Sequence, residues 1–210
     1  MPTIDPTTYV AVSGGPDSLT LLAHYALVTS VRAAIFDYGQ HTFAAEVEAA
    51  RAQCDHYGVR LDEVCVADAG DLVNQGDVEV TREGHDYGIP DYVPNRDIFL
   101  MGTMANVASV DGIPAVAMGL SSIDPVPDAK RMLFGAIFSY FDVRLELPLQ
   151  RMDKTEVIQY GARMAVPFDL SVSCYRATGP GQRPCRDCAS CEQRTAAFAA
   201  AGVLDPLDAV

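Results

Sequence analysis

A glycine-rich hexapeptide, Ser-Gly-Gly-Pro-Asp-Ser, begins at Ser13 and separates an apolar run from an apolar helical pattern. Gly14 and Gly15 permit a positive φ and let the backbone approach a ligand without a Cβ in the way. The amides of such a turn, together with the free N–H groups that begin a helix, favour a bound anion. Ser18 adds a hydroxyl donor, as does Ser13. Asp17 suits such a site only with a divalent cation, usually Mg²⁺, between it and the anion. The hexapeptide therefore predicts a phosphate site.

The pattern is neither the Walker loop, which needs GxxxxGK[ST], nor the dinucleotide fingerprint GxGxxG. Pro16 removes one N–H and stiffens the turn, which is tolerated where a helix starts. A plainer interpretation stays open, in which the turn is only a tight bend whose Ser or Asp caps the helix. The nucleotide-binding residues expected here are Val12, Ser13, Gly14, Gly15, Pro16, Asp17 and Ser18.

A second polar tetrapeptide, Asp-Tyr-Gly-Gln, follows the next apolar run and begins at Asp37. In an open parallel sheet, ligands lie beyond the carboxyl ends of the strands, so this tetrapeptide is expected beside the glycine turn. We predict that Asp37 and Tyr38 contact the nucleotide, with Asp37 holding a metal or a ribose hydroxyl. The alternative for Asp37 is a polar turn at the end of a strand.

Four cysteines near the C-terminus, Cys174, Cys185, Cys188 and Cys191, have the spacing C-x10-C-x2-C-x2-C. Thiolates two residues apart in a turn can bind one ion, and a fourth from outside completes a tetrahedron. Four sulfurs without a histidine favour structural Zn²⁺ over an iron–sulfur cluster. The ion is expected to order the Gly/Pro-rich loop 175–184.

Unrelated buried cysteines are the alternative interpretation of these four residues. The other two cysteines, Cys54 and Cys65, fit core positions of a helix and a strand and are expected to be inert. A reducing compartment is the default when no secretory signal is visible, so the six cysteines are not read as three disulfides. We therefore expect a cytoplasmic protein.

Composition limits the classes of partner. The chain has 210 residues, of which 49% are apolar and 20% charged, as in an ordinary globular protein. Fifteen basic and 28 acidic residues give a net charge of −13. Such a surface disfavours tight binding to nucleic acids or anionic membranes, but a few backbone amides can still hold a small phosphorylated ligand. No apolar run approaches the length of a membrane span.

Apolar runs alternate with helical patterns along the chain, which predicts βαβ units and one open parallel sheet. The expected fold is α/β: a Rossmann-like sheet of five strands with helices on both faces, followed by a zinc-binding segment. The expected strands are Tyr9–Val12, Ala33–Phe36, Leu61–Val66, Ala115–Met118 and Val143–Leu147. The expected helices are Leu19–Val28, Ala44–His56, Ile98–Val110, Leu133–Phe141 and Asp153–Ala165, the last capped by Asp153 or Thr155.

We expect a nucleotide-binding domain over residues 1–170 and a cysteine-rich segment over 171–210, packed on it. Residues 68–94 form a long polar stretch rich in Gly and Asp. A loop of that length is either a lid, a binding loop or a mobile surface segment.

The SGGPDS turn resembles the PP-loop of ATP pyrophosphatases. Taken with DYGQ, with VPNRD before a helix, and with the terminal cysteines, the series is similar over nearly the whole chain to the 7-cyano-7-deazaguanine synthase (QueC) family. The resemblance implies ATP with Mg²⁺, one structural Zn²⁺ on the four cysteines, and a carbon–nitrogen ligase. The implied substrates are 7-carboxy-7-deazaguanine and ammonia, joined through an adenylate and an amide to give the nitrile. A homodimer is the family's tendency.

By the same resemblance, Asp17, Ser18 and Arg96 are the expected catalytic residues. Arg96 lies in the segment that the family writes VPGRN, where its planar fork would face phosphates or the substrate carboxylate. This chemistry depends on holding phosphates and on positioning more than on acid–base catalysis.

The chain departs from the family pattern in three places, which leave the phosphate loop and the metal ligands intact but alter the substrate wall. Where the family has a stretch like DYSGYPDCR that helps to hold the deazapurine, this chain has the shorter Asp124–Arg131, without the aromatic residue. After DYGQ the family usually has a basic residue, then His, with Glu three further on, whereas here His41 follows Gln40 directly and Glu46 is displaced by one. The cysteine loop reads CRDC where CGxC is usual. These departures leave room for a paralogue that stops at the amide or uses another amine. A tRNA-modifying PP-loop enzyme, which the acidic surface disfavours, and a non-catalytic zinc scaffold are the remaining alternatives.

Overall fold

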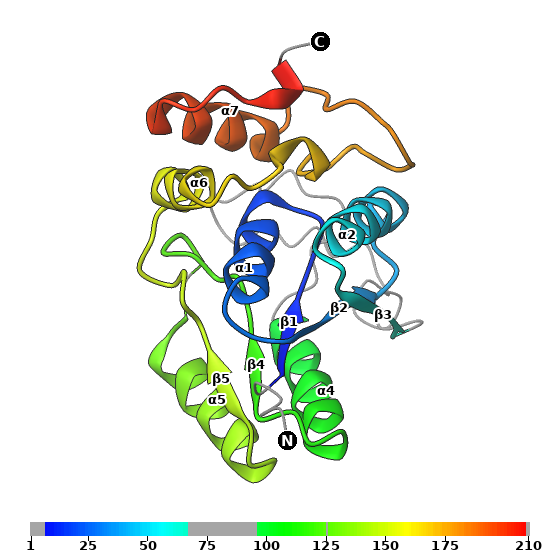
Figure 1. Ribbon diagram of the computed structural model, residues 1–210, viewed down its shortest axis with the longest axis vertical. Coiled ribbons are helices and arrows are strands. Elements are labelled where there is room, and N and C mark those ends of the chain that lie inside the picture. The colour runs from blue at the N-terminus through cyan, green and yellow to red at the C-terminus, as the bar shows by residue number, and fades with distance from the viewer. Residues whose placement is uncertain (1–6, 67–95, 125, 209–210) are drawn as a thin grey trace, which may run out of the picture.

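The computed structural model describes residues 7–66, 96–124 and 126–208. Its centre is a five-stranded parallel sheet in the order β3-β2-β1-β4-β5 (Figure 1). The strands are β1 (Thr8–Ala11), β2 (Val31–Asp37), β3 (Arg60–Cys65), β4 (Ala115–Ala117) and β5 (Arg144–Glu146). The helices are α1 (Pro16–Ala26), α2 (Phe43–Tyr57), α4 (Arg96–Val110), α5 (Asp128–Tyr140), α6 (Lys154–Arg163) and α7 (Ala189–Ala201), with short 3-10 turns at Phe168–Leu170 and Pro206–Asp208. The predicted α/β class and strand number are confirmed.

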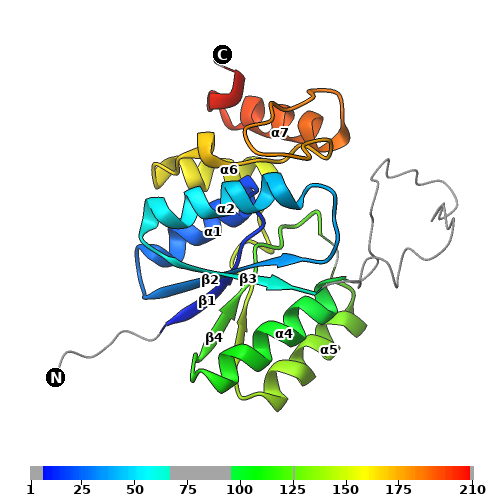
Figure 2. The ribbon, with the colours of Figure 1, turned by 90° about the vertical axis from the view of Figure 1, so that its right-hand side faces the viewer.

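Helices cover both faces of the sheet, as Figure 2 shows. Alternate residues of each strand point to opposite faces. Val10 and Ile35 therefore pack with α1 and α2, while Tyr9 and Phe36 pack with α4 and α5. Because both faces are covered, the central strands are almost continuously apolar, and this is why the sequence indicates them clearly.

Local signals fix where helices begin and end. Pro16 is the first residue of α1, a position at which its missing N–H costs nothing. Helix α2 ends at Gly58, which takes the left-handed conformation with φ of 64°. Asp153 caps α6 and forms a capping box with Glu156, so one of the two predicted caps is confirmed.

The sequence-based prediction omitted α7, which follows the last cysteines and packs on α6 at the top of Figure 1. Its Ala-rich sequence has high helix propensity, and Gly202 ends it with φ of 68°. The prediction for Cys65 was wrong, because this residue ends the edge strand β3 and is exposed. Cys54 is buried as predicted, and burial raises the pKa of its thiol to about 12.

Residues 68–94, the predicted lid or loop, lie outside the described residues, and the division of the chain near residue 170 stays a prediction. Within the described ranges, the helices are all too short or too polar to cross a lipid bilayer.

Candidate active site

A cavity of about 380 Å³ opens at the carboxyl ends of the strands. Its walls come from the glycine turn after β1, the end of β2, the starts of α2, α4 and α6, the segment after β4, residues 172–175 and part of α7. Of the residues predicted for nucleotide binding or catalysis, these line it: Val12, Ser13, Gly15, Pro16, Asp17, Ser18, Tyr38 and Arg96. Gly14 and Asp37 do not. The site lies where ligands bind in open parallel sheets.

The glycine turn is shaped by contacts that only glycine permits. Gly14 has φ of 74°, and a Cβ at this position would lie 2.7 Å from the Glu46 carbonyl oxygen. The Ser18 hydroxyl accepts a hydrogen bond from the Ser13 N–H at 3.1 Å and donates to the Gly15 carbonyl at 3.0 Å. Gly15 precedes α1 without any side-chain cap. The alternative interpretation, in which a Ser or Asp side chain of the turn caps α1, is therefore wrong.

Asp17 in the first turn of α1 is paired with Lys154, the first residue of α6. One carboxylate oxygen, Oδ2, bonds to the lysine Nζ, while Oδ1 is buried without a hydrogen-bond partner among the described residues. Burial raises the pKa of the Asp17 carboxyl, and the ammonium of Lys154 opposes this shift. A buried acceptor with spare capacity is suited to a cation.

Lys154 is a site residue that sequence reasoning missed. A signal for it exists, because a lysine in the first turn of a helix opposes the helix dipole and has no local reason to be there. It also follows the last strand, whose carboxyl end lies at the same edge of the sheet as the glycine turn. The chain's other lysine, Lys130, pairs with Asp97 at 2.8 Å, and neither residue lines the cavity.

The polar turn after β2 is held by its own side chains. Asp37 Oδ1 accepts from the Gly39 N–H at 3.0 Å, as expected of a strand-end turn. Gln40 donates to Glu46 at 3.1 Å, so the displaced glutamate still reaches the turn. The roles predicted for Asp37 and Tyr38 in nucleotide binding stay predictions.

Arg96 begins α4 and is exposed, with its guanidinium 5.7 Å from the centre of the Tyr38 ring. This cation–π contact places a planar donor at the mouth of the cavity. The arrangement fits the predicted role of Arg96 towards phosphate or carboxylate, which stays a prediction.

The four predicted ligand cysteines come together. The Sγ atoms of Cys174, Cys185, Cys188 and Cys191 all lie within 4.8 Å of one another. Tetrahedral Zn²⁺ with bonds of about 2.3 Å needs sulfurs roughly 3.8 Å apart, and the Cys185 and Cys191 sulfurs are separated by 3.9 Å. Burial opposes ionisation of Cys188, but hydrogen bonds from the backbone amides of Cys191 and Tyr175 lower its pKa to about 7. The cluster suits a metal ion such as zinc.

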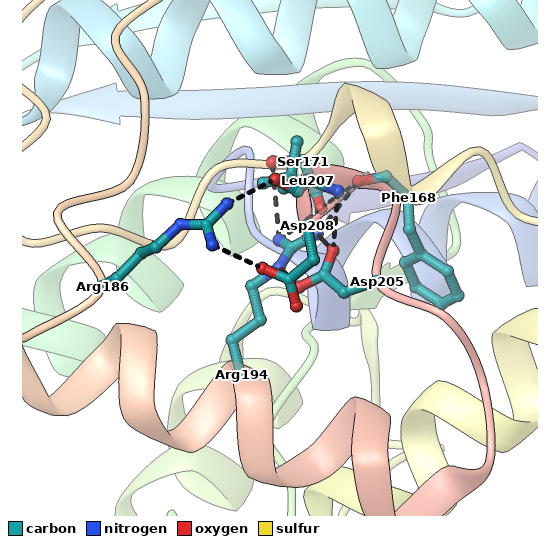
Figure 3. A network of polar contacts seen from close by, with 7 residues as sticks. All are labelled: Phe168, Ser171, Arg186, Arg194, Asp205, Leu207 and Asp208. Carbon is teal, nitrogen blue, oxygen red and sulfur yellow. Dashed lines mark hydrogen bonds and ion pairs between the residues drawn. The ribbon is translucent and has the colours of Figure 1, made fainter. Parts of the chain in front are cut away.

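Residues 171–174, which we call the strap, join this cluster to the glycine turn. The Val172 N–H donates to the Gly14 carbonyl at 2.9 Å. Beside the strap, the buried guanidinium of Arg194 binds both carboxylate oxygens of Asp205, at 2.6 and 2.9 Å, and the Ser171 hydroxyl at 2.8 Å (Figure 3). The cysteine cluster and α7 therefore fix the wall of the cavity that faces the glycine turn.

Comparison with known protein families shows which family has this glycine turn and this cysteine cluster. The model for "Queuosine biosynthesis protein QueC" matches residues 7–202. The chain belongs to the QueC family. A QueC-family relative from Chlorobaculum parvum, named 7-cyano-7-deazaguanine synthase, is 31% identical and covers 94% of this chain and 93% of its own. Another from Desulfitobacterium hafniense, 7-cyano-7-deazaguanine synthase 2, is 32% identical, with 96% and 92% covered.

A solved structure from Methanocaldococcus jannaschii, described as a predicted subunit of tRNA methyltransferase, superposes on this QueC-family chain with a TM-score of 0.51. It is 15% identical and covers 75% of this chain and 74% of its own. At that identity the likeness concerns the fold alone.

Proposed function

We propose that this protein is an ATP-dependent carbon–nitrogen ligase that makes 7-cyano-7-deazaguanine from 7-carboxy-7-deazaguanine and ammonia. The substrate carboxylate attacks the α-phosphorus of ATP and releases pyrophosphate. Ammonia then attacks the acyl adenylate, releasing AMP and leaving the amide. A second ATP adenylates the amide oxygen, and loss of AMP with a proton gives the nitrile. Each nitrile therefore consumes two ATP.

The observation that carries the proposal is the pairing of Asp17 with Lys154 beside the glycine turn, inside a cavity of a QueC-family chain. The Gly15 amide and the first turn of α1 offer donors to a polyphosphate. Lys154 adds a positive charge to the same cavity. The relatives named as synthases support the choice of substrate.

Asp17 is the residue that would hold Mg²⁺, because its Oδ1 is a buried acceptor with no partner in the described part of the chain. Mg²⁺ held there would neutralise phosphate charge and make pyrophosphate a better leaving group. The remaining tasks belong to the protein: the glycine turn fixes the phosphates, and Arg96 orients the carboxylate for attack. Zinc on the four cysteines would have thiolate at every position, leaving none for substrate, and would hold the strap.

Incubation of the purified protein with ATP, Mg²⁺, ammonium and 7-carboxy-7-deazaguanine tests this proposal directly. Mass spectrometry should find the nitrile, with two pyrophosphates released for each molecule formed. ATP turnover without any change in the deazaguanine acid, or no turnover at all, would reject the assignment.

A second candidate is a QueC-like ligase that stops at the amide or uses another amine. It is favoured by the segment after β4, where Asp124 lines the cavity but accepts hydrogen bonds from the backbone N–H and hydroxyl of Ser121. The aromatic residue that the family pattern has there is missing. The same incubation separates the two, since the amide would accumulate with one pyrophosphate per molecule.

A further inference from the structure

Gln53 on α2 is a fully buried polar side chain that has no part in the chemistry described above. Its Nε2 donates to the Gly14 carbonyl at 2.7 Å and to the Leu170 carbonyl at 3.0 Å. Its Oε1 is buried without a partner among the described residues. An unpaired buried oxygen costs free energy, so a residue kept at that cost requires an explanation.

The two carbonyl groups explain the orientation of the amide. If the side chain were flipped, Oε1 would face both carbonyl oxygens and Nε2 would lose both acceptors. Gln53 therefore acts as a double donor. One of its acceptors, Leu170, directly precedes the strap, and the other, Gly14, belongs to the glycine turn.

The Gly14 carbonyl is held from two directions, by Gln53 Nε2 at 2.7 Å and by the Val172 N–H at 2.9 Å. No cis peptide bond occurs in the described ranges of the chain. In a planar trans peptide, the carbonyl of one residue and the N–H of the next point in opposite directions. Fixing the Gly14 carbonyl therefore also fixes the direction of the Gly15 N–H.

That N–H is available to a ligand. Gly15 lines the cavity, whereas Gly14 does not. Within the part of the chain that the structure covers, the Gly15 N–H donates to no acceptor. We propose that Gln53 is a positioning residue that locks the Gly14–Gly15 peptide so that the Gly15 N–H donates to the polyphosphate of the nucleotide. This inference rests on the proposed function and assigns a role to a residue outside the cavity.

The test compares wild type with Gln53→Met, which keeps the length and apolar stem of the side chain but donates nothing. Its probe is inorganic pyrophosphate with Mg²⁺, measured by titration calorimetry and by the NMR shift of the Gly15 amide. Wild type should bind and move that amide proton downfield. Gln53→Met should bind about three- to tenfold more weakly, the range for one lost hydrogen bond, with a smaller Gly15 shift. Adenosine affinity should be unchanged.

Ser171→Ala is the matched control, because Ser171 is also buried and its side chain also makes hydrogen bonds that hold the strap. Its hydroxyl donates to the Phe168 carbonyl at 2.6 Å and accepts from Arg194, but it makes no hydrogen bond to Gly14. This variant should melt at a lower temperature yet bind pyrophosphate as wild type does.

The outcomes separate the two claims. Equal pyrophosphate affinity and an equal Gly15 shift in wild type and Gln53→Met would overturn the positioning role. A loss of affinity in Ser171→Ala as large as in Gln53→Met would also overturn it, because the effect would then follow general loosening. Failure of wild type to bind either pyrophosphate or ATP would instead reject the proposed function.

Discussion

Two ion pairs, one buried and one partly exposed, differ in how completely their carboxylates are satisfied. Arg194 and Asp205 are each 4% exposed, and both carboxylate oxygens are paired. Asp17 is 15% exposed, and among the described residues only one of its oxygens has a partner. Removing one partner of a fully paired buried charge leaves the other uncompensated and destabilises the fold, whereas a carboxylate with an unused oxygen can still accept a ligand. The comparison predicts that the first pair governs stability and the second governs activity.

The cysteine cluster, like the Arg194–Asp205 pair, is expected to govern stability, and its loss should have the largest effect on the free energy of unfolding. Cys188→Ser is expected to lose bound zinc and more than about 5 kcal/mol of the free energy of unfolding, since metal binding to such sites is folding energy. Elemental analysis and thermal melting measure both. Cys65→Ser, at the exposed cysteine outside the cluster, should keep one zinc per chain and melt normally. Stoichiometric zinc in Cys188→Ser would contradict the ligand assignment.

Arg194→Met should come next. Removing the guanidinium leaves Asp205 as a buried unpaired carboxylate, which costs about 3–5 kcal/mol. Urea unfolding measures the loss. Arg194 lines the cavity, but its three nitrogens all donate to Asp205, Ser171 or Phe168. At a temperature where the variant stays folded, its affinity for ATP should therefore fall less than twofold. If Arg194→Met were as stable as wild type, the Arg194–Asp205 pair would not govern stability, and the contrast with Asp17–Lys154 would be wrong.

Asp17→Asn should have the opposite effect to Arg194→Met: activity should fall while stability is retained. Pyrophosphate release should fall by about 10²–10³-fold, the usual cost of losing a group that stabilises transition-state charge. The variant should remain folded, with a melting temperature at neutral pH equal to or above that of wild type.

The sign of this stability effect follows from the raised pKa of Asp17. The folded chain holds that proton more tightly than the unfolded chain, so stability declines as pH rises from the ordinary carboxyl range through the folded-state pKa. Asparagine removes this decline. Asp97→Asn, at the aspartate paired with the other lysine, is the matched control and should retain activity. If Asp17→Asn and Asp97→Asn lost pyrophosphate release equally, the proposed role of Asp17 in catalysis would be contradicted.

Much of this arrangement could be predicted because its signals are local. Buried parallel strands are apolar along their length, the glycine turn has a fixed spacing, and cysteines two residues apart indicate a metal site. Helix α7 had a local signal too, in its alanines and Gly202, but the adjacent cysteines dominated the interpretation of that segment. Cys65 was misplaced because an apolar-looking strand does not reveal that it lies at the sheet's edge.

The tertiary pairings could not be predicted in the same way. Lys154 and Asp17 are separated by 137 positions, and Gln53 and Gly14 by 39. Their contacts depend on how α6 and α2 pack against the turn after β1. Sequence spacing alone does not specify such packing, although a lysine that opposes a helix dipole is a clue to it.

Lys154→Met sharpens the comparison with the smallest expected effect. The lysine neutralises Asp17 in the ligand-free protein and faces the same cavity as the glycine turn. Its loss should weaken ATP binding about tenfold, as expected for one charge-assisted contact. Lys130→Met removes the chain's other lysine, which is likewise paired with an aspartate but lies away from the cavity, so it should bind ATP normally. If both variants bound ATP equally well, Lys154 would only balance the charge of Asp17. The Asp17–Lys154 pair would then contribute to stability and not to nucleotide binding.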